Sequence, residues 1–243
     1  MNPETFLSGP RPLSLDSVGP LERCPVLILA PHPDDFDEVG VTLRRFAARG
    51  ADLHVLVLSS SPNGVEDGFC DPPTDAVKAA VREEEQRRSA AFFGLRPERL
   101  EFLRLPAGEG GFLRDGVDIL SRLRASVEKI RPALAVLPHG HDSNPDHRLT
   151  SAWWRRIAPS DRPVKTLFFR DPKTLAMRLD AFSAFGDEEA DWKSELLRFH
   201  LSQQERNRRT RGYGLDERIL RVNRMSAREL GRPEPYAEAF EIG

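Results

Sequence analysis

The sequence has little cysteine, no long hydrophobic run and almost no net charge. Its two cysteines, Cys24 and Cys70, are too few for a disulfide framework and lack the paired spacing of a thiolate zinc site. No stretch approaches the roughly 18 apolar residues of a membrane span, and residues 1–23 lack the apolar run of a signal peptide. We therefore expect a protein without a membrane span in the reducing cytoplasm.

The net charge of −2, from 36 basic and 38 acidic residues, excludes the basic excess of a general nucleic-acid binder. One local cluster, Arg206, Arg208, Arg209 and Arg211, has acidic neighbours such as Glu205 and is interpreted as a solvated helix face. Hydrophobic residues make up 39% of the 243 positions, which suits one globular core. We expect a single domain spanning residues 1–243 and a small-molecule partner; no oligomeric state is predicted.

Short apolar segments alternate with amphipathic ones along the chain. Apolar runs predict strands over residues 25–30, 52–58, 100–105, 133–137 and 164–169, and helical spacing predicts helices over 37–48, 75–93 and 117–130. This order predicts an α/β fold, a Rossmann-like three-layer sandwich with a mostly parallel sheet. A helical C-terminal extension is expected from about residue 191, with a break at residues 212–214.

The first polar motif, Pro31-His32-Pro33-Asp34-Asp35, comes directly after the first expected strand. Ligands of an open parallel sheet bind beyond the carboxyl ends of its strands, so this loop lies where a site is expected. The two prolines restrict the backbone, and adjacent side chains on a stiff extended loop point in different directions. One carboxylate can then bind a metal ion while the other faces a substrate.

The second motif, residues 138–147, follows the fourth expected strand and is expected to form a loop at the same edge of the sheet. It holds His139, His141 and His147, three of the six histidines of the chain. One of them, together with His32 and an aspartate of the first motif, makes a set of two nitrogens and one oxygen. Such a set leaves a tetrahedral zinc ion open to water, as in hydrolytic sites.

Each of these features also has a purely structural interpretation. Taken alone, the first motif is favoured as a turn whose carboxylate caps the following helix, but two such loops at consistent strand ends favour a metal site. His54, within a strand, and His200, in a helix, are expected to be structural or surface histidines. Trp153 and Trp154 could stack against a sugar, although at least one is expected to lie in the core.

The two motifs, together with Arg82-Glu83-Glu84-Glu85 before Ala90-Ala91, resemble those of the LmbE/PIG-L family of zinc-dependent de-N-acetylases. The resemblance runs from about residue 26 to at least residue 148, and residues 236–240 are similar to the endings of family members. It implies removal of the acetyl group from N-acetylglucosamine units, such as those of glycosyl inositols and of thiol-cofactor precursors.

Position by position, the resemblance implies that His32, Asp35 and His147 bind zinc and that Asp34 is the general base. Iron or another divalent ion can compete for such ligands. The corresponding hypothesis is that the metal polarises the acetyl carbonyl and activates water while Asp34 accepts the water proton. The products are acetate and a free amine.

The chain departs from the family pattern at two places. Family members commonly carry a histidine three residues before the last ligand, held by the intervening aspartate, here Asp146; this chain has Asn144 instead. An amide cannot act as a general acid, but it can donate a hydrogen bond to an oxyanion, which is worth roughly 3 kcal/mol in other enzymes. His141 or His139 could supply the proton to the departing amine instead, or Asp34 could return it. Asp37 can fill the acidic position that follows the first motif, but fewer glycines come after it.

Two further segments are candidates for substrate contacts. Arg82 begins the charged part of its helix, where its guanidinium could bind a substrate hydroxyl, carboxylate or phosphate or could pair with nearby glutamates. Residues 59–74 form a long polar loop that could be a wall or lid of the site, around Asn63, Gly64 and Asp67.

Two other classes of protein stay open. A metal-binding relative that only recognises a sugar would keep the motifs without catalysing hydrolysis, and acetate release distinguishes it. A non-haem iron oxygenase also uses two histidines and one carboxylate, and the His32-x-Asp34 spacing suits it, although the parallel α/β order counts against it. Metal analysis and an oxygen-consumption assay distinguish that class.

Overall fold

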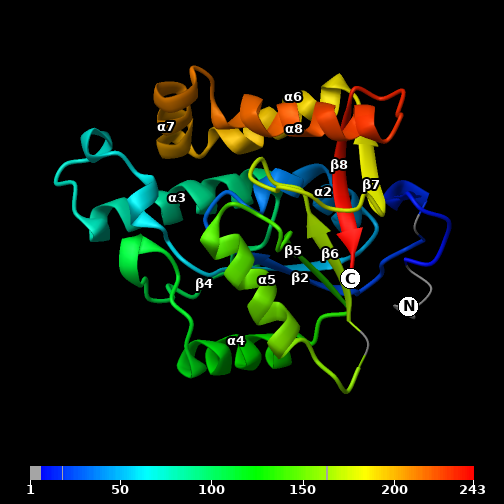
Figure 1. Cartoon of the computed structure of the whole chain (residues 1–243), viewed down its shortest axis with the longest axis horizontal. Coiled ribbons are helices and arrows are strands. Elements are labelled where there is room, and N and C mark those ends of the chain that lie inside the picture. Colours follow the sequence, from blue (N-terminus) through cyan, green and yellow to red (C-terminus); the bar gives the residue numbers. More distant parts are fainter. Residues whose placement is uncertain (1–6, 18, 163) are drawn as a thin grey trace.

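The computed structural model describes residues 7–17, 19–162 and 164–243. Part of residues 1–23, in which no signal peptide is expected, therefore lies outside the described residues. In the described residues one eight-stranded sheet has the order β1-β7-β8-β6-β5-β2-β3-β4 (Figure 1). The strands are β1 (Leu13–Ser14), β2 (Pro25–Ala30), β3 (Asp52–Val57), β4 (Leu100–Phe102), β5 (Leu134–Pro138), β6 (Lys165–Phe169), β7 (Ala181–Phe185) and β8 (Tyr236–Ile242). Neighbouring strands are parallel except where β8 pairs with β6 and β7.

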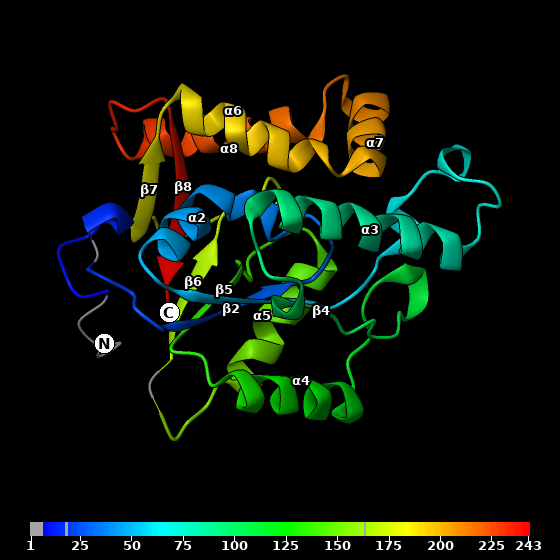
Figure 2. The same ribbon diagram turned by 180° about the vertical axis from the view of Figure 1, so that it is seen from behind.

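Helices cover both faces of this sheet. α2 (Gly40–Ala48) and α3 (Asp75–Phe93) lie on one face, and α4 (Val117–Ile130) and α5 (Pro145–Ile157) lie on the other (Figures 1 and 2). α6 (Asp187–Arg198) packs against α2 and α3, α7 (Leu201–Arg211) packs against α3, and α8 (Leu215–Glu229) packs against β8 and α6. The predicted Rossmann-like three-layer fold is confirmed, with these last helices added on the side of α2 and α3. No described helix is both long and apolar enough to cross a membrane.

The apolar run of β2 is continuous because the strand is buried on both faces. Val26 and Ile28 join the core under α2, whereas Leu27 and Leu29 join the core under α4 and α5. Trp153 and Trp154 belong to this second core and are 1% and 2% exposed. Their indole nitrogens donate to Asp115 and Thr166 within the protein, so both are structural.

Several expected boundaries differ from the structure. α2 begins at Gly40, because residues 37–39 form a 3-10 turn, and β4 ends at Phe102, shortly before Arg104 adopts a left-handed φ of 48°. The expectation that residues 138–147 form one loop is wrong for the last three residues, which belong to α5. Asn144 caps α5 by accepting a hydrogen bond from Asp146 N at 3.0 Å, and Pro145 occupies its first position, so the helix carries His147.

The C-terminal third differs from its expected pattern in two ways. The helical segment begins at Asp187 instead of near residue 191 and breaks at Phe199 and His200 as well as at residues 212–214. After α8 the chain returns to the sheet, where β8 inserts between β6 and β7. Neither β7 nor β8 is predicted from the sequence.

The strand order places a crevice between β2 and β5. From β2 the chain continues outward through β3 and β4 on one side, whereas β5 is followed by β6 on the other. Such a point of reversal is where open α/β sheets bind ligands. Because β2 and β5 are adjacent and parallel, the segments that follow them meet at this crevice.

Candidate metal centre and substrate cavity

The segments after β2 and β5 bring together the three predicted metal ligands. One nitrogen each of His32 and His147 and one carboxylate oxygen of Asp35 all lie within 4.8 Å of one another. All three side chains are buried, and His147 is 0% exposed. His32 is held in the loop that the two prolines stiffen, and His147 in the first turn of α5.

Two outer carboxylates orient the imidazoles of this trio. Asp146 Oδ2 accepts from His32 Nε2 at 2.8 Å, which leaves Nδ1 of the same ring 3.3 Å from Asp35 Oδ2. Asp142 Oδ2 lies 3.3 Å from His147 Nδ1, which leaves Nε2 of that ring 3.4 Å from Asp35 Oδ1. Each ring therefore has one nitrogen held by an outer acid and one directed at Asp35, the arrangement found around metal-binding histidines.

The donor set fits a divalent metal ion. His147 Nε2 is buried and forms no hydrogen bond with a described residue. Burial alone would lower the pKa of His147, but Asp35 and Asp171 outweigh it and raise this pKa to about 10. The negative charge that holds a proton there would equally favour a cation, and two nitrogens with one oxygen suit zinc while leaving a position open.

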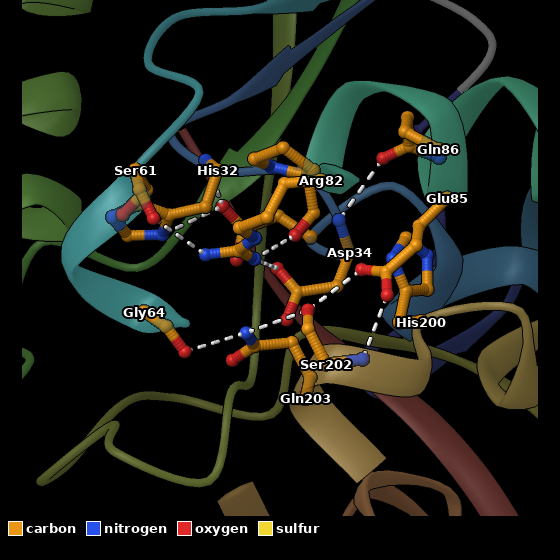
Figure 3. A network of polar contacts seen from close by, with 12 residues as sticks. His32, Asp34, Ser61, Gly64, Arg82, Glu85, Gln86, His200, Ser202 and Gln203 are labelled. Carbon is orange, nitrogen blue, oxygen red and sulfur yellow. Dashed lines mark hydrogen bonds and ion pairs between the residues drawn. The ribbon is translucent and has the colours of Figure 1, made fainter. Parts of the chain in front are cut away.

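Asp34 faces the cavity instead of the trio, and α3 holds it there (Figure 3). Its backbone has a φ of 109°, which is unusual for a residue other than glycine. Gln86 Oε1 accepts from Asp34 N at 2.9 Å, and Arg82 Nη2 lies 3.1 Å from Asp34 Oδ1 and also donates to the Pro33 carbonyl. These contacts from α3 stabilise the strained backbone.

Arg82 has a structural role in addition to its position in the cavity wall, because its guanidinium binds other residues of the protein. It is 3% exposed, lines the cavity, and also donates to the Ser61 carbonyl at 3.4 Å. Its contacts are with Asp34 and loop carbonyls and not with nearby glutamates. The neighbouring Gly64 allows this approach, since a Cβ there would lie 2.6 Å from Arg82 Nη1.

The polar residues of the second motif differ in whether they line the cavity. Asn144 lines the cavity; its side-chain oxygen caps α5, and its amide nitrogen donates to no described residue. Asp146 binds His32 and also accepts from Leu113 N at 2.8 Å, so it is a positioning residue. His141 is exposed, and neither it nor His139 lines the cavity; His139 Nε2 lies 3.4 Å from Glu241. The structure thus does not favour either histidine as proton donor.

The other two histidines lie apart from the trio. His200 is buried at the junction of α6 and α7 and bonds Asp37 at 2.6 Å, and His54 in β3 bonds Asp52 at 3.1 Å. Both have the structural role expected of them. Asp37, the candidate for the family's acidic position, is 0% exposed and serves this buried pair.

A cavity of about 390 Å³ opens beside the trio. Asn63 and Gly64 of the long loop form part of its wall, as proposed for this loop, whereas Asp67 pairs with Lys78 at 2.5 Å outside it. The opposite wall comes from α7 and α8. Arg208, Arg209 and Arg211 are exposed, as expected of a solvated helix face, but Arg206 and Arg211 also line the cavity there.

Sequence reasoning missed several acidic and basic residues near the trio. Glu38 lines the cavity, and burial, with Asp171 and Asp35 nearby, raises its pKa well above the ordinary value. Asp171 and Lys173 follow β6, the strand beside β5. The same rule about carboxyl ends of parallel strands, applied to this third strand, would have found them.

Asp142 offers a test of the outer acids. Replacing it with asparagine keeps an oxygen for Asn144 N, which now donates to Asp142 Oδ1 at 2.6 Å, but removes the charge beside His147. We expect metal affinity to fall about 10- to 100-fold. Competition with a chromophoric chelator measures this, with the exposed Asp161→Asn as control; equal affinity in both variants would contradict the role.

Comparisons with known proteins extend this picture. A family model described as PIG-L, GlcNAc-PI de-N-acetylase, matches residues 27–158, which is more than half of the chain. The match includes both motifs and ends with α5. No curated protein sequence matches the chain.

Solved structures share the fold at low sequence identity. N,N'-diacetylchitobiose deacetylase from Pyrococcus horikoshii has a TM-score of 0.72 at 18% identity, over 90% of this chain and 83% of that one. The 4-carboxy-2-hydroxymuconate hydratase GalB from Pseudomonas putida has a TM-score of 0.70 at 21% identity, over 91% and 95%. The zinc-inhibited form of a teicoplanin deacetylase has a TM-score of 0.68 at 18% identity, over 90% and 97%.

Proposed function

The chain belongs to the PIG-L family of GlcNAc-PI de-N-acetylases, and we propose that it is a zinc-dependent hydrolase that removes the acetyl group from the amine of an N-acetylglucosamine-type substrate. The observation that carries this proposal is the buried trio His32, Asp35 and His147 at the edge of a cavity that is also lined by Asp34. A single domain over residues 1–243 is part of the proposal, because β8 completes the sheet that holds the site.

His32, Asp35 and His147 would hold the metal ion. A divalent ion there supplies a Lewis acid that polarises the acetyl carbonyl and makes water easier to deprotonate. Asp34 lies outside the trio, so its carboxylate is free to accept the proton of the attacking water. The side-chain amide of Asn144 donates a hydrogen bond to the oxygen that becomes negative. Asp34 then returns its proton to the departing amine, so no proton from His141 is required.

A panel of N-acetylated amino sugars tests the reaction. Acetate release and the appearance of free amine are measured with and without a chelator, and zinc or iron(II) is added back separately. We expect hydrolysis of at least one N-acetylglucosaminide, its loss with chelator, and recovery with zinc. Metal bound tightly without any hydrolysis across the panel would instead support a sugar-recognising relative that is not a catalyst.

The assay also covers the open alternatives. The hydratase among the similar structures shows that this fold carries more than one chemistry, so the acyl product itself must be identified. An oxygen-consumption measurement on the iron-loaded protein tests the oxygenase alternative, for which no uptake is expected. A cytoplasmic location and the absence of nucleic-acid partners stay predictions from the sequence.

A further inference from the structure

Positive charge is concentrated in one part of the cavity, which is lined by Lys173, α7 and α8 and which we call the outer half. Five cationic side chains line the cavity: Arg82, Lys173, Arg206, Arg211 and Arg218. Arg82 belongs to the inner end, where Asp34 and loop carbonyls bind it. The other four come from the segment after β6 and from α7 and α8, which face the metal trio across the cavity.

These outer cations have few acidic partners. Within the described residues Arg218 makes no ion pair and no side-chain hydrogen bond, and the ammonium of Lys173 makes none either. Arg211 donates only to neutral oxygens, those of Asn207 at 3.4 Å and Thr210 at 2.8 Å. Arg206, by contrast, approaches Glu66 at 3.9 Å, and the charges of nearby acids act on Lys173. Since guanidinium groups near protein surfaces commonly pair with carboxylates, the unpaired Arg218 and Arg211 are available for an outside anion.

The same cations lie close enough to repel one another. Burial is the main cause that lowers the pKa of Arg211, and the positive charge of the neighbouring Arg218 lowers it further. Burial would also lower the pKa of Lys173, and Arg218 opposes protonation there too, but Asp171, Glu38 and Asp35 outweigh both and raise it. The charge of Arg218 thus acts on both Arg211 of α7 and Lys173, the lysine that faces the inner acids. Like charges held together in this way favour binding of a negative group.

Buried contacts hold α7 and α8 over the cavity, so this charge is not placed by surface side chains alone. The carboxylate of Glu85 in α3 accepts from both the backbone and the hydroxyl of Ser202 at 2.7 Å (Figure 3). Gln203 Nε2 donates to the Gly64 carbonyl at 2.9 Å, and the side chain of Gln204 accepts from Leu215 N, the start of α8, at 3.0 Å. The arginines are therefore presented by an anchored wall.

We propose that this outer half binds an anionic group of the substrate, a phosphoryl or carboxylate substituent remote from the acetylated amine, through Arg218 and Arg211. The proposal rests on the proposed function, because it orients an amino sugar with its acetamide at the trio and its anion at α7 and α8. Guanidinium groups match both phosphate and carboxylate with paired donors. α7 and α8 lie beyond residues 27–158, so the family match does not assign this role.

Matched substrates test the proposal in the metal-loaded enzyme. The substrates are N-acetylglucosamine 1-phosphate, the N-acetylglucosaminide of glycolic acid and the neutral methyl N-acetylglucosaminide. For wild type we expect at least one anionic substrate to have a KM ten-fold or more below that of the methyl glycoside. Arg218→Gln should remove this preference by raising KM for the anionic substrate about ten-fold more than KM for the methyl glycoside. Comparison of the two anionic substrates separates phosphate from carboxylate.

A matched control lies one turn along α8. Arg221 is exposed and pairs with Glu217 at 2.6 Å without lining the cavity, so Arg221→Gln should keep the preference for the anion. Equal KM values for all three substrates in wild type, or an equal effect of Arg218→Gln on all three, would overturn the proposal.

Binding of the deacetylated sugars separates this proposal from the reaction itself. Glucosamine 1-phosphate, the glucosaminide of glycolic acid and methyl glucosaminide are titrated calorimetrically into wild type and Arg218→Gln. Tighter binding of an anionic amine that depends on Arg218 supports the anion site even if no acetylated sugar is hydrolysed, in which case only the proposed function fails. Equal binding of all three amines by wild type overturns the anion site, whatever the hydrolysis assay shows.

Discussion

Asp34→Asn is expected to lower kcat about 10²- to 10⁴-fold without lowering metal content. The substitution removes the carboxylate that would accept the proton of water. Asparagine has almost the same shape, can still accept a hydrogen bond from Arg82, and tolerates the positive φ of this position better than most residues. Because Asp34 lies outside the ligand trio, the metal site should stay intact.

The measurement combines steady-state kinetics with metal analysis of the same preparation. Asp67→Asn is the control: this aspartate of the nearby loop pairs with Lys78, its side chain is 86% exposed, and its loss should leave kcat within about two-fold. Wild-type activity in Asp34→Asn would refute the general-base role. Loss of metal together with activity would instead place Asp34 among the ligands.

Lys193→Met is expected to lower the free energy of unfolding by about 3–5 kcal/mol. Lys193 in α6 is 0% exposed, and its ammonium donates to the Glu38 carbonyl at 2.6 Å, to Asn223 Oδ1 at 2.8 Å and to Glu238 Oε1 at 2.6 Å. Burial lowers the pKa of Lys193 even with Glu238 beside it. Removing the lysine would leave the Glu238 carboxylate buried without its counter-charge.

This buried pair joins segments that are far apart in the sequence. Glu238 in β8 also accepts from Val41 N at 3.0 Å and Thr42 N at 2.7 Å, at the beginning of α2. The lysine and glutamate thus connect the C-terminal helices and last strand to the segment that follows the first motif. We expect the loss of Lys193 to weaken that connection before it affects the other face of the sheet.

Chemical denaturation of wild type and variant measures the change. Lys129→Met, at an exposed position of α4, is the matched control and should change stability by less than about 0.5 kcal/mol. The double variant Lys193→Met/Glu238→Gln should be less destabilised than the sum of the single ones, because it no longer buries an unpaired charge. A loss below about 1 kcal/mol for Lys193→Met would show that the pair is not a structural connection.

The central strands could be predicted because their signal is local. The runs at residues 25–30 and 52–58 are apolar without interruption, as strands buried on both faces must be. β7 and β8 are not predicted from the sequence because they pair with each other across more than fifty residues, a contact that a local pattern does not report. The start of α5 was missed although Asn144 and Pro145 carry the usual signals of a helix start, because three nearby histidines suggested a continuous loop.

The sequence by itself determined which polar residues meet at the crevice. His32, Asp35 and Asp34 follow one buried strand and His147 follows another, and the parallel topology that the alternating pattern predicts brings such strand ends together. These residue types favour a divalent ion with an acid beside it.

Only the tertiary structure decided what surrounds that centre. Asp142 and Asp146 orient the imidazoles, Arg82 and Gln86 hold Asp34, and the cations of α7 and α8 face the trio across the cavity. None of these contacts follows from periodicity or spacing, because each joins side chains through packing of elements whose relative positions a local pattern does not specify. An arginine at a helical spacing looks the same in the sequence whether it faces solvent or a substrate.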